Sequence, residues 1–184
     1  MAEVYLAIYD LSMGMARNLS SQFLGPAHTI DIIPHTAIIV FGKEYFFGRG
    51  IESCTPNEFR QTRGIHPIEV KLIGRTEKSK IEFEQWCIIQ GQNGQFGVES
   101  YDLLTRNCNN FSHEAAIHGL ELPIGVPQWI LDVPSKFLSS PMGMMIRPIL
   151  EGMQVRNFVI YCISIDPAVP TCTLTNILLI LLHS

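Results

Sequence analysis

The sequence has few charged residues and no cluster of one sign. Lys and Arg number 13 and Asp and Glu 17, so the formal net charge over 184 residues is −4. Proteins that grip nucleic acid neutralise a series of phosphates with Lys and Arg, and no run of these residues occurs here. We therefore expect no nucleic-acid partner.

The cysteines lack the pairing pattern of a disulfide or zinc framework. There are five, irregularly spaced and without a C-x-x-C pair. The N-terminal MAEVYLAIYD has neither the basic leader nor the apolar stretch of a signal peptide. We expect a reduced protein in the cytoplasm and nucleus, in which a free thiol can serve as a thiolate.

Metal and cofactor signatures are incomplete. In HEAAIH the histidines His113 and His118 lie five apart rather than four, so on a helix they diverge by about 140° and cannot share a metal. In GRGIES, Gly48 and Gly50 lack the third glycine of a dinucleotide fingerprint, and Ser53 stands in its place. We predict no metal and no cofactor.

No apolar run reaches the roughly 20 residues that a membrane helix needs. The longest runs, FVIYCISI and NILLILL, lie in the tail and are separated by Asp166, Pro167 and Pro170. We expect no membrane anchor, and divide the chain into a folded domain, residues 1–155, and an apolar tail of unknown role, residues 156–184.

The folded part predicts one α+β domain. VYLAIYD indicates a strand, PHTAIIVFG and EYFFG indicate a hairpin turning at Gly42 and Lys43, and GIHPIEVKLIG indicates a further strand. A helix is expected over residues 76–94 with Thr76 as a possible N-cap, and a second over 108–120. Five prolines break residues 122–154 into short helices.

The second helix opens with Cys108, and Asn107 can act as its N-cap. A thiol at a helix start is helped toward thiolate by unpaired N–H groups and the helix dipole. His35, at the start of a strand, is the best candidate for its base. From the pattern alone, a structural cysteine and a packed histidine stay the commoner outcome, and Cys54 is a rival nucleophile.

Four blocks add a more specific signal: IYDLSMGMARNLS, IPHTAIIVFGKEYFFGRGIESC, YDLLTRNCNNFS and VPQWILDVPSKFLSSPMGMMIRPILEGM. Together they resemble the PPPDE family of permuted papain-like cysteine peptidases over about residues 4–154. The family's catalytic histidine and cysteine fall on His35 and Cys108. Pro34 stands where close relatives often carry an aromatic residue.

The resemblance implies an isopeptidase without a cofactor that acts on SUMO- or ubiquitin-conjugated proteins as a homodimer. Cys108 would attack the carbonyl of the modifier's C-terminal glycine, with His35 as proton acceptor and donor. The oxyanion needs donors, for which the Cys108 backbone N–H and the side chains of Asn107 or Asn109 are candidates.

Two other functions stay open at this stage. The same thiolate would serve a protein S-acyl thioesterase that removes fatty acyl groups from cysteines. The chain could also be a non-catalytic adapter that binds SUMO or ubiquitin conjugates with an idle dyad.

Overall fold

The computed structural model describes residues 1–24 and 26–145, which form a five-stranded antiparallel sheet flanked by helices. In the sheet the strands follow the order β4-β3-β2-β1-β5. Their bounds are β1 Ala2–Asp10, β2 Pro34–Val40, β3 Lys43–Gly48, β4 Gly50–Cys54 and β5 Glu69–Thr76. The predicted α+β class, a small antiparallel sheet packed with helices, is confirmed, and the predicted tail 156–184 lies outside the described residues.

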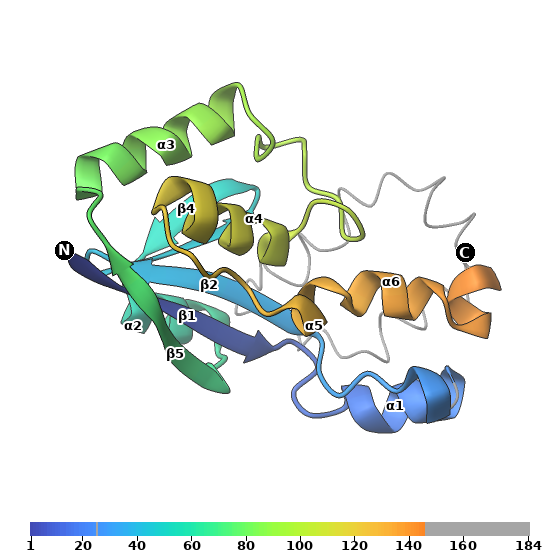
Figure 1. Cartoon of the computed structure of the whole chain (residues 1–184). Coiled ribbons are helices and arrows are strands. Elements are labelled where there is room, and N and C mark those ends of the chain that lie inside the picture. Colours follow the sequence, from blue (N-terminus) through green and yellow to red (C-terminus); the bar gives the residue numbers. More distant parts are fainter. Residues whose placement is uncertain (25, 146–184) are drawn as a thin grey trace.

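Helices cover both faces of this sheet. Figure 1 shows α3 and α4 on one side and α2 on the other, with α1, α5 and α6 beyond one end of the strands. Among the described residues, no helix is both long enough and apolar enough to cross a membrane. The helices are α1 Ala16–Phe23, α2 Pro56–Arg63, α3 Lys80–Gln92, α4 Cys108–Glu114, α5 Gln128–Leu131 and α6 Val133–Leu138, with a 3₁₀ turn at Pro26–His28 and a π turn at Ala115–Gly119.

The two faces bury separate apolar clusters. The larger lies beneath α3 and α4 and includes Ile38 of β2, Phe83 of α3 and Phe111 of α4. The smaller lies beneath α2 and is made of Ala7, Tyr9, Ala37, Phe46 and Phe59. Successive side chains of a strand point to opposite faces, so neighbouring residues of β2 contribute to different clusters.

The hairpin between β2 and β3 turns one residue earlier than predicted. Phe41 and Gly42, rather than Gly42 and Lys43, take the positive φ values of 53° and 76° that a tight hairpin needs. β2 pairs with β3 only from Ile38↔Tyr45 to Val40↔Lys43, and β3 then continues alongside β4. Residues 34–37, at the start of β2, are therefore not paired with β3.

One predicted helix cap is wrong, and two elements were missed. α3 is capped by Ser79, whose hydroxyl accepts from Glu82 N–H in a capping box, while the predicted cap Thr76 ends β5 and donates to the Leu120 carbonyl at 2.7 Å. Strand β4 and helix α2 were not predicted. The short helices α5 and α6 agree with the proline-broken segment.

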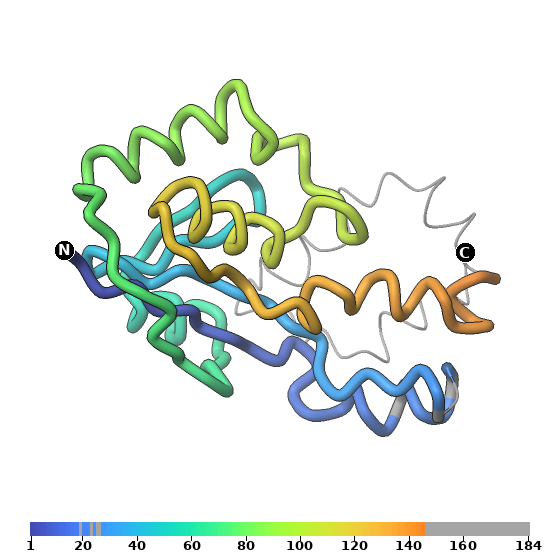
Figure 2. Tube along the Cα trace, viewed as in Figure 1, coloured from blue at the N-terminus to red at the C-terminus, as the bar shows by residue number. Residues whose placement is uncertain are grey.

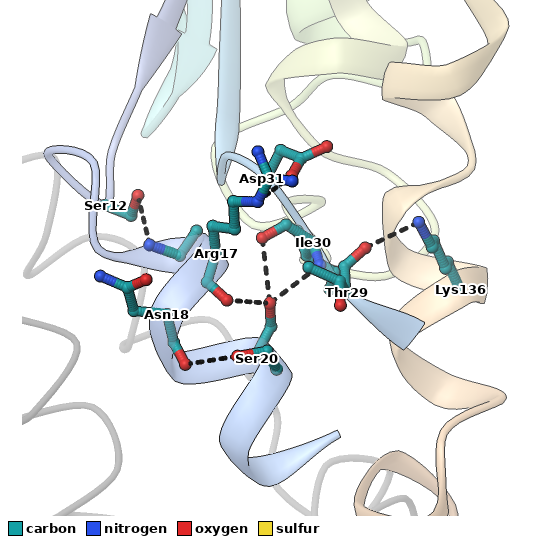
Figure 3. Close-up of polar contacts among 10 residues, drawn as sticks. Ser12, Arg17, Asn18, Ser20, Thr29, Ile30, Asp31 and Lys136 are labelled. Atoms are coloured by element: carbon teal, nitrogen blue, oxygen red, sulfur yellow. Dashed lines mark hydrogen bonds and ion pairs between the residues drawn. The ribbon is translucent and has the colours of Figure 1, made fainter. Parts of the chain in front are cut away.

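The segment that leads into β2 is anchored by polar contacts from both sides (Figure 3). The Ser20 hydroxyl donates to the Ile30 carbonyl at 3.0 Å and accepts from Ile30 N–H at 2.9 Å. Lys136 of α6 donates to the Thr29 carbonyl at 2.8 Å. The Asp10 carboxylate accepts from Ile33 N–H at 3.0 Å. These bonds fix the backbone just before His35.

Candidate active site

Helix α4 begins at Cys108 because Asn107 caps it. The side-chain oxygen of Asn107 accepts from the N–H groups of Asn109 and Asn110 at 2.9 and 3.2 Å, and the Asn110 side chain accepts from Asn107 N–H at 2.9 Å. The Asn107 amide also donates to the Leu103 carbonyl at 2.9 Å. The predicted N-cap is confirmed, and both the oxygen and the nitrogen of this amide contribute to holding the helix start.

Replacing this cap should weaken the fold measurably. Asn107→Ala leaves two buried N–H groups without their acceptor, so we expect the free energy of unfolding to fall by about 1–2 kcal/mol. Asn107→Ser keeps a capping oxygen and should recover most of that loss. Urea unfolding followed by circular dichroism measures both variants, and equal stability of the alanine and serine variants would contradict the capping role.

Helix α4 takes over the edge of β2 that β3 leaves. The Asn109 amide donates to the Pro34 carbonyl at 3.1 Å, and its oxygen accepts from the Thr36 hydroxyl at 3.0 Å. The Ser112 hydroxyl donates to the Thr36 carbonyl at 2.9 Å. Asn109 thus bonds the residues on either side of His35, so its amide, like that of Asn107, serves to position the site.

The Cys108 thiol lies at this junction, 4 % exposed. Burial raises its pKa to about 11, and the backbone of Thr36 and the Tyr101 hydroxyl lower it by less. The sequence predicted that the helix start would favour the thiolate. In the folded chain desolvation of the charged sulfur outweighs those donors, so at neutral pH the thiol is protonated.

Tyr101 is a site residue that the sequence analysis did not single out. Its hydroxyl lies 4.0 Å from Cys108 Sγ, and both groups are buried. A tight turn brings them together, because Asp102 and Arg106 exchange backbone hydrogen bonds of 2.9 Å each way. Figure 2 shows this connection between α3 and α4 folding back to the start of α4. In the sequence, the D-x-x-T spacing of Asp102 and Thr105 indicates this turn, because Thr105 donates from its N–H and its hydroxyl to the Asp102 carboxylate.

His35 lies on the other face of the sheet from α4. Its ring stacks on Phe59 of α2 at 5.8 Å between ring centroids and meets the Phe46 ring edge-on at 6.2 Å. Within residues 1–24 and 26–145, neither ring nitrogen has a hydrogen-bond partner. Burial, and to a lesser extent the charge of Arg63, lower its pKa to about 3, so the imidazole is neutral at physiological pH.

The structure therefore brings Cys108 to the backbone beside His35 but does not bond the two side chains. The sulfur interacts with the backbone of Thr36, the residue that follows His35. In the described part of the chain, no hydrogen bond joins Sγ to the imidazole. The two groups approach the same strand from opposite faces, at the stretch where β3 has turned away.

The other candidates have ordinary surroundings. Cys54 ends β4 half-buried, and burial raises its pKa above the usual value. Burial raises the pKa of Cys87 to about 12. His118 pairs with Glu114 at 3.5 Å on the helix surface. No group of three metal-ligating side chains occurs among the described residues.

Comparison with known proteins places these features in a family context. Residues 2–151 match the family model described as "PPPDE putative peptidase domain". Desumoylating isopeptidase 1 of Xenopus laevis is 40% identical over 156 residues, covering 83% of this chain and 86% of the relative. The rat and human proteins of that name are 39% and 38% identical, each over 83% of this chain and 87% of the relative.

Proposed function

Because the chain belongs to the PPPDE peptidase family, we propose that it is a cysteine isopeptidase that cleaves SUMO from lysine side chains of conjugated proteins. The Xenopus, rat and human relatives carry the name desumoylating isopeptidase 1, and they align with most of the chain. Ubiquitin is the alternative modifier, since both end in a glycine pair. Homodimer formation stays a prediction.

One observation carries the proposal: the Cys108 sulfur lies against the backbone next to His35, at the edge of β2 that β3 leaves and α4 covers. When a strand is hydrogen-bonded to a neighbouring strand, that neighbour blocks the path around its edge from one face of the sheet to the other. Along residues 34–37 that neighbour has left β2, and Asn109 and Ser112 of α4 bond the edge instead. A thiol and an imidazole can meet around such an edge with only local adjustment.

In the proposed reaction Cys108 is the nucleophile and His35 the proton acceptor. As Sγ bonds to the carbonyl carbon of the modifier's last glycine, its proton passes to His35. The lysine amine then leaves with that proton, and water releases the modifier from the thioester. Burial keeps His35 in the neutral form that a general base needs, but a pKa of about 3 makes the buried imidazole a weak base, so the reaction requires its surroundings to become more polar when substrate binds.

Substrate binding has to bring the pair together. At neutral pH the site holds a protonated thiol and an unprotonated imidazole that are not hydrogen-bonded to each other within the described residues. Catalytic hydrogen bonds often tighten only when substrate is bound. We therefore propose that the free enzyme is a resting form, and that the modifier's tail draws the imidazole toward the sulfur.

The proposal is tested with SUMO and ubiquitin that carry a C-terminal propargylamide group, which reacts with the nucleophilic cysteine of such enzymes. We expect the SUMO probe to label the chain at Cys108, as peptide mass spectrometry would locate, and the ubiquitin probe to react more slowly. Cys108→Ser is the matched control. If neither probe labels a folded chain while Cys108 cleaves a long-chain acyl thioester, the isopeptidase proposal fails in favour of a thioesterase.

A further inference from the structure

We infer that Tyr101 is a catalytic residue, whose hydroxyl donates a hydrogen bond to the oxyanion formed when Cys108 attacks the substrate carbonyl. The inference deepens the proposed function and rests on it. Tyr101 is 6 % exposed, and its hydroxyl is directed at Cys108 Sγ from 4.0 Å.

The asparagine side chains beside Cys108 each already donate one of their two amide N–H groups to a backbone carbonyl. The Asn107 amide donates to the Leu103 carbonyl, and the Asn109 amide donates to the Pro34 carbonyl. Turning either amide toward a substrate would break a bond that holds α4 in place. The Tyr101 hydroxyl, in contrast, points at a sulfur, which is a weak acceptor and is easily exchanged for a stronger one.

The distance of 4.0 Å suits this role better than direct activation of the thiol. The oxyanion is attached to the same carbon as the sulfur, and an effective donor lies about 3 Å from that oxygen. A donor that serves the oxygen must therefore stand somewhat away from the sulfur itself. Burial strengthens such a bond, because water does not compete for the charge.

The tyrosine is held where it is needed. Its ring packs on Phe47 at 5.1 Å between centroids, and the reciprocal backbone bonds of Asp102 and Arg106 close the turn that carries it. A donor held in place in this way needs little reorganisation free energy during the reaction. The Cys108 backbone N–H, on the first residue of α4, would be the second donor.

The step keeps all its protons and electrons. As the bond from Sγ to the carbonyl carbon forms, the π electron pair moves onto the oxygen, and the thiol proton passes to His35. Tyr101 keeps its own proton and shares it in a hydrogen bond with the oxygen. The electron pair returns when the C–N bond breaks, and the amine leaves with the proton from His35.

Tyr101→Phe tests the inference, with Tyr45→Phe as control. Tyr45 is a buried tyrosine of β3 whose hydroxyl contacts Glu84 at 3.1 Å, away from the site. For hydrolysis of SUMO-aminomethylcoumarin, we expect kcat of Tyr101→Phe to fall by about 10²–10³-fold with KM nearly unchanged, and Tyr45→Phe to match wild type. Thermal unfolding confirms that both variants are folded.

Alkylation of Cys108 by iodoacetamide separates the oxyanion role from thiol activation, because alkylation forms no oxyanion. We expect its rate in Tyr101→Phe to fall far less than turnover does. Turnover within threefold of wild type, or an equal fall in both rates, would overturn the inference. A small activated ester is measured in parallel: if wild type hydrolyses it through Cys108 but cleaves neither modifier, the isopeptidase proposal fails while Tyr101 can still be judged.

Discussion

Cys108→Ala should abolish cleavage of SUMO conjugates, with a fall in kcat of about 10⁴-fold or more. In the proposed mechanism this change removes the nucleophile and with it the acyl-enzyme route, and such losses are among the largest that single substitutions produce. The fold should tolerate the change, because the side-chain contacts of Sγ with Tyr101 and Asn109 are long, at 4.0 and 3.8 Å. Release of SUMO from a conjugated protein, followed by gel electrophoresis, measures the effect.

Cys54→Ser supplies the matched control for that experiment. Cys54 was the rival nucleophile in the sequence, and it ends β4 half-buried with a raised pKa. We expect Cys54→Ser to retain wild-type turnover. The assignment of the nucleophile is wrong if this variant loses activity while Cys108→Ala keeps it.

His35→Phe should separate catalysis from stability. Turnover should fall by about 10²–10⁴-fold, because the proposed proton acceptor is lost. The phenyl ring fits among Phe46 and Phe59, where His35 now stacks, and it removes two buried nitrogens that have no partner among the described residues. At pH 7 we expect the free energy of unfolding to equal or exceed that of wild type.

The same variant should resist acid better than wild type. The folded-state pKa of His35 is about 3, against an unfolded value of 6.5, so between these values the unfolded chain binds a proton that the folded chain does not. Stability from this group is fully present above pH 6.5 and is lost as pH falls. Wild type should lose about 2 kcal/mol more than His35→Phe between pH 6.5 and 5.

Urea unfolding at several pH values tests this difference. His66→Gln is the control, because His66 lies exposed between α2 and β5. Parallel pH curves for His35→Phe and wild type would show that the imidazole is not buried in an uncharged form. Full activity of His35→Phe would remove His35 from the mechanism.

Capping residues and strand and turn patterns in the sequence were enough to predict most of the helices and strands. Asn107 before an apolar-periodic segment predicted its cap, and the alternation of turn and strand residues predicted the β2–β3 hairpin. Such patterns also mark what was missed: T-P-N-E at Thr55 and S-K-I-E at Ser79 are capping boxes that mark the starts of α2 and α3.

Two properties of the site could not be predicted from such local patterns: the face of the sheet on which His35 lies, and the pKa of Cys108. HTAIIV is apolar along both faces, so its pattern does not say toward which side His35 points. The pKa of Cys108 depends on burial beneath Tyr101 and against Thr36, which are brought together only by the tertiary fold. Helix-start chemistry therefore suggested a thiolate where burial favours the thiol.

The two hydrogen bonds of Asn109 link the backbones beside the two proposed catalytic residues, Cys108 and His35. Asn109 adjoins Cys108 in sequence, and it grips Pro34 and Thr36, which adjoin His35. Cys108 and His35 are 73 residues apart in the sequence, but these two hydrogen bonds fix the positions of their backbones relative to each other. The length of the intervening chain does not determine that spacing. We therefore expect changes in the length of the surface loops between them to leave the relative position of Cys108 and His35 unchanged. A substitution of Asn109 would instead displace both residues.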